Sequence, residues 1–133
     1  MTKYLKIKFD KEEALAIMLE KEAPKTCNAI WNLLPISGEL HYAKFAGKEV
    51  FFIIPLVMDF EKATPVTTLE PGSVAYWPNR QFICIYYGKL QKEEENVVVF
   101  AKIIKKLDKI SKKLDEIRFR QGKKIYITGV VGE

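Results

Sequence analysis

The apolar residues of this chain fall into short runs, and the longest of them, residues 50–58, has nine positions and is interrupted by Pro55. A helix that crosses a bilayer needs about 20 consecutive apolar residues, so the sequence predicts no membrane-spanning segment. The hydrophobic core must therefore be assembled from many short elements. With 133 residues, of which 48% are hydrophobic, the chain can bury one continuous core, and we expect a single domain over residues 1–133.

Several of these runs have the two-residue period of β-strands. Residues 4–9 alternate charged and apolar side chains, which predicts a strand with one buried face. Residues 40–45 and 49–54 flank a turn at 46–48, in which Gly47 can adopt a positive φ, so they predict a β-hairpin. Further strands are predicted at residues 73–77, 82–87 and 124–129, and a charged loop at residues 88–96.

A short amphipathic helix is predicted to begin at Pro24, because proline suits the first helical position, where its missing N–H would have no partner. The apolar positions that follow have helical spacing, and they are Cys27, Ile30, Trp31 and Leu34. Pro35 ends the helix. Trp31 lies on this apolar stripe, and we expect it to anchor the core rather than to contact a ligand.

Two segments carry conflicting patterns. Between residues 97 and 119, apolar residues recur with spacings of three and four, which alone favours one long amphipathic helix. The run Val97–Phe100, however, is β-branched and aromatic, which favours a strand. Residues 14–19 have the position of a second strand after a turn, but their alanine, leucine and methionine residues also favour helix. Both interpretations of each segment remain open at this point.

The composition argues against several classes of site. The chain has 22 basic and 17 acidic residues, and all but three of the basic residues are lysine, which resembles the composition of heat-adapted proteins. Two cysteines and one histidine form no recognisable metal or redox motif, and there is no glycine-rich phosphate loop. We therefore expect no catalytic residue, no metal and no cofactor. His41 is expected to be a polar residue of a strand.

The same considerations give an expected location. The first residues lack the charged, apolar and small-residue regions of a secretory signal, so a cytoplasmic protein is expected. Thiols stay reduced in that compartment, and Cys27 and Cys84 should be small buried hydrophobes.

A lysine-rich segment suggests one class of partner. The lysines are Lys105, Lys106, Lys109, Lys112 and Lys113, and they would follow one predicted helix. Such a helix can bind nucleic acid or another polyanion. Asp108, Asp115 and Glu116 interrupt the lysines and can pair with them at helical spacing. A solvated helix face is therefore favoured over nucleic-acid binding.

Five stretches of the chain occur in an order that resembles the cyclophilin family. They are residues 23–26 (Ala-Pro-Lys-Thr), 52–55 (Phe-Ile-Ile-Pro), 71–72 (Pro-Gly) leading to 81–82 (Gln-Phe), 98–102 (Val-Val-Phe-Ala-Lys) and 124–127 (Lys-Ile-Tyr-Ile). The resemblance implies a mainly β fold with two helices, in which a closed β-barrel is capped by the helices. It also implies a strand at residues 14–19, a strand at 97–103 and a helix at about 106–119.

Residues 72–88 resemble, without gaps, a segment of small prokaryotic cyclophilin-like proteins whose function is unassigned. The distinctive shared residues are the Tyr-Trp-Pro sequence at 76–78 and Cys84. The positions at which this chain departs from those relatives are Ser73, Ala75, Asn79 and Arg80. If these positions bind a ligand in the relatives, the resemblance does not imply that this chain binds the same ligand. The resemblance therefore predicts the fold better than the function.

Unrelated side chains stand where the resemblance would put the residues that bind and isomerise prolyl peptides. Phe52, three residues before Pro55, takes the place of the arginine, and Phe60 that of the glutamine. Lys92 falls near the tryptophan position and Val97 at the histidine position. Phe52 cannot donate a hydrogen bond that would help to lower the isomerisation barrier of ~18–20 kcal/mol. The resemblance therefore implies that standard prolyl isomerase chemistry is absent.

Residues 76–78 fall where cyclophilins have small residues along the peptide groove. Their rings either fill this groove or build a new apolar site with Arg80 at its rim. The candidate ligand-binding residues are Phe52, Phe60, Tyr76, Trp77 and Arg80. The expected function is the binding of a small apolar ligand or a peptide in a remodelled groove. The first alternative is a weak peptidyl-prolyl isomerase, and the second is a polyanion-binding protein.

Overall fold

The computed structural model describes residues 1–43, 47–90 and 95–132. Its strands are β1 (Thr2–Phe9), β2 (Glu12–Met18), β3 (Ile36–Glu39), β4 (His41–Tyr42), β5 (Gly47–Ile53), β6 (Thr64–Pro65), β7 (Ser73–Trp77), β8 (Phe82–Leu90), β9 (Asn96–Lys105) and β10 (Lys124–Gly132). Its helices are α1 (Pro24–Leu33) and α2 (Leu107–Asp115), with short 3-10 helices η1 (Val66–Thr68) and η2 (Glu116–Arg118). Within these described ranges, no helix is long and apolar enough to span a bilayer.

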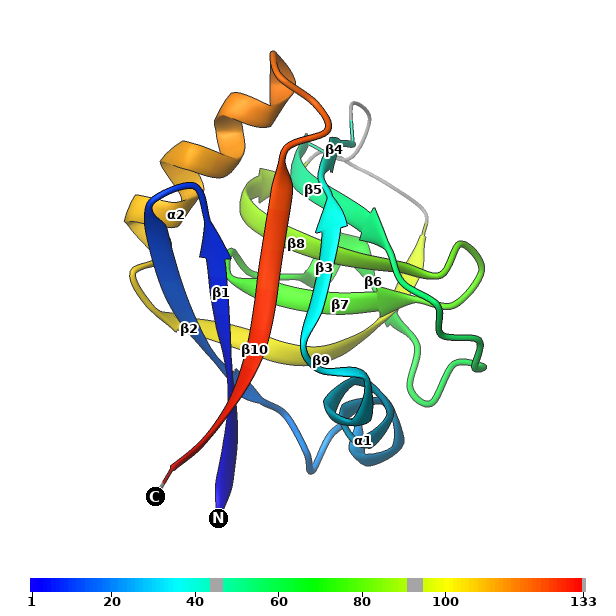
Figure 1. Ribbon diagram of the computed structural model, residues 1–133. Helices are drawn as coiled ribbons and strands as arrows, with labels where there is room; N and C mark the ends of the chain where they lie inside the picture. Colours follow the sequence, from blue (N-terminus) through cyan, green and yellow to red (C-terminus); the bar gives the residue numbers. More distant parts are fainter. Residues whose placement is uncertain (44–46, 91–94, 133) are drawn as a thin grey trace.

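The strands form one antiparallel sheet that curves around the hydrophobic core (Figure 1). The order along the sheet is β3-β10-β1-β2-β9-β7-β8-β5-β4, and the short strand β6 pairs with β9 outside this path. Helix α2 lies across one end of the curved sheet, and α1 lies near the opposite end, where β1 and β10 run side by side to the two chain termini (Figure 1). The predicted mainly β fold with two helices is confirmed.

The expectation of a closed barrel is wrong. Strands β3 and β4 end the series of paired strands, and within the described residues no ladder joins one end of the sheet to the other. Where β3 approaches β5, the ring of Phe52 lies directly over Gly38. Phe52 is fully buried, and the two strands meet there through this side chain instead of through backbone hydrogen bonds. A bulky core residue thus occupies the seam of the curved sheet.

Both ambiguous segments contain strands, as the family resemblance implied. Of the ambiguous segment at residues 14–19, all but Leu19 belongs to β2, which pairs with β1. The 97–119 segment divides into β9 and α2 at Lys106, whose φ of 63° lies in the left-handed region. A residue with this backbone conformation cannot continue either a strand or a right-handed helix, so the periodic apolar residues on its two sides belong to different elements.

Other sequence predictions can be compared directly with the structure. Gly47 has the predicted positive φ of 94°, whereas Ala46 lies outside the described residues. Cys27 and Cys84 are buried, as expected. Burial raises the pKa of the Cys27 thiol to about 12, and the thiol donates a hydrogen bond to the carbonyl of Phe100 at 3.3 Å. Trp31 packs against the core but is only partly buried.

Strand β3 was not predicted, although it pairs with β10 and places Gly38 beneath Phe52. Its sequence, Ile-Ser-Gly-Glu, contains one apolar residue and a glycine, so it has no strand periodicity of its own. Tertiary pairing with β10 determines this strand. Strand β6 is a second strand that residue patterns did not predict.

We expect Gly38→Ala to destabilise the fold by about 1–3 kcal/mol, because a Cβ at this position would overlap the buried ring of Phe52 and the core cannot expand freely. Urea unfolding monitored by circular dichroism measures this loss. Gly132→Ala is the matched control, since its Cβ would lie 3.3 Å from the flexible ring edge of Tyr4. If the Gly38→Ala and Gly132→Ala proteins have the same free energy of unfolding, the contact between Phe52 and Gly38 does not constrain the fold as described.

Candidate functional site

Four aromatic side chains gather on the outer face of the sheet, and we call them the outer-face aromatic cluster. They are His41 from β4, Phe51 from β5, Trp77 from β7 and Phe82 from β8. Their arrangement follows from strand alternation and register. Trp77 is the register partner of Phe82, and each is the neighbour in sequence of an inward-facing core residue. Sheet pairing thus brings together side chains that lie far apart in the sequence.

The rings of this cluster are in direct contact. The rings of Phe51 and Phe82 are stacked, with centroids 4.4 Å apart. Trp77 meets Phe82 edge to face at 5.9 Å, and His41 lies 5.6 Å from Phe51 on the other side. These separations are typical of favourable aromatic pairs, each of which contributes about 0.5–1.5 kcal/mol beyond the area that it buries. The rings therefore form a continuous, fixed apolar surface.

One part of this apolar surface is covered and another part is open. Towards β9, the same sheet face is buried, and its covered residues are Val66, Ala75, Cys84, Tyr86 and Val97. The rings of Phe51, Trp77 and Phe82 pack against this buried patch but remain partly exposed. Ile53, the register partner of Phe82 on β5, is 66% exposed. The aromatic cluster is therefore the accessible continuation of a small second core.

Two polar groups accompany the cluster. The guanidinium of Arg80 lies over the indole ring of Trp77, with its central carbon 5.8 Å from the ring centroid. This geometry allows a cation–π interaction. The indole Nε1–H of Trp77 is buried and has no hydrogen-bond acceptor among the described residues. An unmade buried hydrogen bond of this kind costs about 1–3 kcal/mol, and buried donors in folded proteins are rarely left in this state.

The structure does not bring the five sequence-predicted ligand residues together. Phe52 and Tyr76 point into the main core and are fully buried. Trp77 and Arg80 lie on the outer face. Phe60 is 37% exposed on the segment between β5 and β6. Of the other positions compared with cyclophilins, Val97 is buried in the second core, and Lys92 lies outside the described residues.

The segment between β5 and β6 is fixed at two points. The hydroxyl of Tyr76 donates a hydrogen bond to the carbonyl of Leu56, and burial raises the pKa of this hydroxyl. Glu61 reaches the start of α1, where its carboxylate accepts hydrogen bonds from the Lys25 and Thr26 N–H groups at 2.8 Å and from the Thr26 hydroxyl at 3.0 Å. These contacts position Phe60, which lies next to Glu61 in the sequence.

The electrostatics of Glu61 follow from these contacts. Burial by itself raises the pKa of this carboxyl, but the hydrogen bonds from Thr26 and Lys25 outweigh that effect and hold the pKa below the ordinary value of 4.5. The carboxylate satisfies two of the N–H groups that every helix leaves unpaired at its first turn. Glu61 therefore caps α1 from a distant part of the chain, where the residue before the helix, Ala23, supplies no side-chain cap.

Sequence reasoning missed Phe51, Phe82 and His41. A usable signal was present, because neighbours in a strand point to opposite faces and so Tyr76 and Trp77 cannot both line one groove. The strands predicted at residues 73–77 and 82–87 are separated by a short segment, and pairing them as a hairpin would have placed Phe82 beside Trp77. His41 had no such signal, because its strand contains only two residues.

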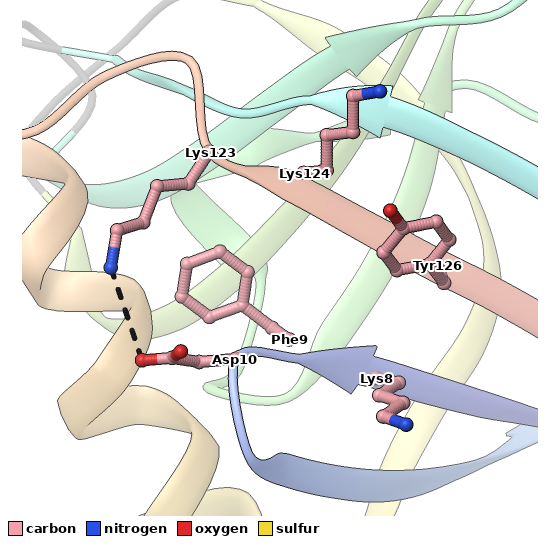
Figure 2. Close-up of a pocket in the computed structure, with 6 residues that line it drawn as sticks. All are labelled: Lys8, Phe9, Asp10, Lys123, Lys124 and Tyr126. Carbon is pink, nitrogen blue, oxygen red and sulfur yellow. Dashed lines mark ion pairs between the residues drawn. The ribbon is translucent and has the colours of Figure 1, made fainter.

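The larger hollows lie away from this cluster. Two of them have volumes of about 460 Å³ each. One lies beside the start of β10 and is drawn in Figure 2. The other is lined by Tyr42, Gly47, Lys48, Lys89, Leu90 and Arg118. Across the described ranges, no group of three or more histidine, cysteine, aspartate or glutamate side chains is placed to hold a metal ion.

Comparisons with known proteins identify a family and two solved structures that are similar to this chain. A family model described as cyclophilin-like matches residues 3–128. The structure of McbB in complex with tryptophan superposes with a TM-score of 0.82 at 14% sequence identity, over 97% of this chain and 46% of McbB. The solution structure of the hypothetical protein AF2241 from Archaeoglobus fulgidus superposes with a TM-score of 0.69 at 23% identity, over 96% of this chain and 94% of that one.

These likenesses differ in what they establish. The chain spans less than half of McbB, and at these identities both solved structures establish similarity of fold alone. No curated protein matches the sequence. The resemblance that the sequence predicted, to small cyclophilin-like proteins of unassigned function, is confirmed by the family match and by AF2241.

We expect Glu61→Ala to destabilise the fold by about 1 kcal/mol near neutral pH, which is the typical effect of losing an N-terminal helix cap. Because the folded-state pKa of Glu61 is lowered, its carboxylate stabilises the fold above the unfolded-state pKa. This contribution is lost as the pH falls through the folded-state pKa. The difference between the variant and the parent protein should therefore disappear in acid.

Urea unfolding at about pH 7 and about pH 3 measures this difference. Glu22→Ala is the matched control, because Glu22 is exposed near α1 and makes no hydrogen bond or ion pair with any residue that the structure describes. A loss of stability in Glu61→Ala that stays constant with pH would contradict the capping role.

Proposed function

This chain belongs to the cyclophilin-like family, and on that premise we propose that it binds an apolar peptide segment on the outer-face aromatic cluster without performing standard prolyl isomerisation. A small apolar ligand is the second occupant that we consider. The observation that carries the proposal is the set of partly exposed, mutually packed rings, beside which the indole N–H of Trp77 has no acceptor in the described part of the chain.

The exposed surface around the cluster favours a peptide. Ile53 is 66% exposed and adjoins Phe82 by strand register, so apolar contact area extends beyond the rings themselves. Contiguous exposed apolar surface of this kind marks interaction sites in soluble proteins. Small-molecule ligands are usually enclosed in concave pockets, whereas peptides in extended form bind along open, aromatic-lined surfaces.

The polar groups suggest how such a peptide would be oriented. Trp77 Nε1 is buried in the free protein, so the indole would have to shift for a backbone carbonyl of the peptide to satisfy this donor and recover the energy lost in the free protein. Arg80 lies at the edge of the same indole and can bind a carboxylate of the ligand. Tryptophan and arginine are also the residues that most often dominate binding energy at interfaces.

The comparison with McbB supports this use of the fold. Its structure was solved in complex with tryptophan, and it superposes on 97% of this chain. An aromatic amino acid is therefore a ligand of a protein of which 46% superposes on this chain. For the present chain, we propose that an aromatic or proline ring of the ligand packs on Phe51 and Phe82.

The position of Phe52 supports binding without isomerisation. The family resemblance puts the catalytic arginine at this position, but Phe52 has no hydrogen-bond donor and its ring is buried in the main core. The arginine that assists rotation of the prolyl amide over a barrier of ~18–20 kcal/mol in cyclophilins is thus missing at this position. A weak isomerase remains the alternative, and it differs from the main proposal in turnover and not in affinity.

We expect Trp77→Phe to weaken binding of an end-blocked tetrapeptide with a central Phe-Pro pair roughly three- to tenfold, because it removes the indole N–H and keeps an aromatic ring. Amide chemical shifts of the labelled protein, followed during titration, measure this affinity. Trp31→Phe is the matched control, because it makes the same change within α1, away from the cluster. Equal affinity of the Trp77→Phe protein and the parent, or shifts confined to other parts of the sheet, would contradict the proposed site.

We expect no acceleration of cis–trans exchange of the same peptide, because Phe52 offers no donor to the prolyl amide. Exchange spectroscopy in the titrated sample measures the rate directly, and uncatalysed exchange takes tens to hundreds of seconds. Exchange much faster than this, and slowed again by Trp77→Phe, would establish the isomerase alternative and remove the non-catalytic proposal.

A further inference from the structure

The hollow beside the start of β10 carries a basic surface that the proposed function does not use. It has a volume of about 460 Å³, and its walls are formed by Lys8, Phe9, Asp10, Lys123, Lys124 and Tyr126 (Figure 2). These residues come from the end of β1, the turn that follows it and the beginning of β10. The outer-face aromatic cluster belongs to β4, β5, β7 and β8, so the two surfaces are separate parts of the sheet.

Tyr126 provides an exposed ring in this hollow. Its neighbours in the strand, Ile125 and Ile127, are buried in the core, so alternation turns Tyr126 to the outer face. The residue is 50% exposed. Strand register fixes its surroundings, because Lys8 of β1 lies directly opposite it. Figure 2 shows Lys8 and Lys124 on opposite sides of the Tyr126 ring.

The charges of the hollow leave two cations available. Asp10 is the acid in the wall, and its carboxylate lies 3.9 Å from Lys123 Nζ and 3.8 Å from Lys113 Nζ, so its charge is already offset. Glu13, which lies across the strand pair from Lys8, is 3.4 Å from Lys6 Nζ instead. Lys124 lies opposite Glu39 in the register with β3. Within the described residues, neither Lys8 nor Lys124 makes an ion pair.

From this arrangement we propose that the hollow binds a nucleoside phosphate, with the base stacked on Tyr126 and the phosphate held by Lys8 or Lys124. An exposed tyrosine ring stacks on any nucleobase, because every base has a π-face. Lysine is a point charge on a flexible chain, and it binds phosphate without a fixed geometry. The same chemistry suits a free nucleotide or one nucleotide of a single strand.

The lysines of this hollow are not those of the lysine-rich segment at residues 105–113. Of the lysines considered for a polyanion site, Lys109, Lys112 and Lys113 lie in α2, whereas Lys105 ends β9 and Lys106 precedes the helix. Acidic residues are interspersed with the lysines of α2. Lys8 and Lys124 belong to different strands, and pairing of β1 with β10 brings them to one aromatic ring. Strand pairing, and not the net charge of +5, thus creates this grouping of two lysines around one ring.

Titration of the labelled protein at low ionic strength with AMP, adenosine, inorganic phosphate and a short single-stranded oligoadenylate tests the proposal. We expect amide shifts around Tyr126, with AMP bound more tightly than adenosine or phosphate alone. Tyr126→Thr removes the ring at an exposed strand position and should weaken AMP binding at least about fivefold. Lys8→Gln combined with Lys124→Gln should weaken AMP binding and reduce its salt dependence.

A matched double variant, Lys21→Gln with Lys109→Gln, removes the same charge at exposed positions elsewhere. It should change the AMP affinity less than twofold. Equal weakening by the two double variants, binding of phosphate as tight as that of AMP, or no shifts near Tyr126 at low ionic strength would each overturn the proposal. An oligoadenylate affinity at least about tenfold above that of AMP would identify a single strand as the source of the nucleotide, and similar affinities would identify the free nucleotide.

Discussion

Alternation of side chains along paired strands is the constraint on which both faces of this molecule depend. Each strand sends successive residues to opposite sides of the sheet, and antiparallel register then decides which residues of neighbouring strands meet. Phe52 and Tyr76 are placed in the core by this rule, while the adjacent Phe51 and Trp77 are placed outside. A shift of one residue in the register of β5 or β7 would turn the core side chains to the outer face and the outer aromatic side chains to the core.

The same constraint produces two outer surfaces of different chemistry on one continuous sheet. At β5, β7 and β8, the outward positions are aromatic, and their rings pack edge to face and in a stack. At the end of β1 and the start of β10, the outward positions are Lys8, Lys124 and Tyr126. The first surface suits apolar contact with one unpaired donor, and the second suits an anionic ligand with a flat ring. Both are built on strands whose inward residues are buried, so their geometry is held by the core.

Much of the strand and helix content was accessible from residue patterns. The amphipathic stripe after Pro24 indicated α1, and the alternation before Asp10 indicated β1. Residue patterns did not predict the glycine-containing β3, whose local signal is weak. They also favoured one long helix where Lys106 separates β9 from α2. The candidate site was predicted only in part, because Trp77 and Arg80 were named but Phe51 and Phe82 were not. The grouping of Tyr76 with Trp77 ignored the opposite directions of neighbouring side chains.

The sequence by itself determined the mainly β composition, the helix at Pro24, the burial of both cysteines and the resemblance to cyclophilin-like proteins, because these depend on residue type and short-range periodicity. Only the tertiary structure decided that Phe52 occupies the open seam of the sheet over Gly38, that Glu61 caps a helix 35 residues away, and that Lys8 and Lys124 flank Tyr126. These arrangements depend on strand register and on contacts between distant segments, which no local pattern in a single sequence specifies.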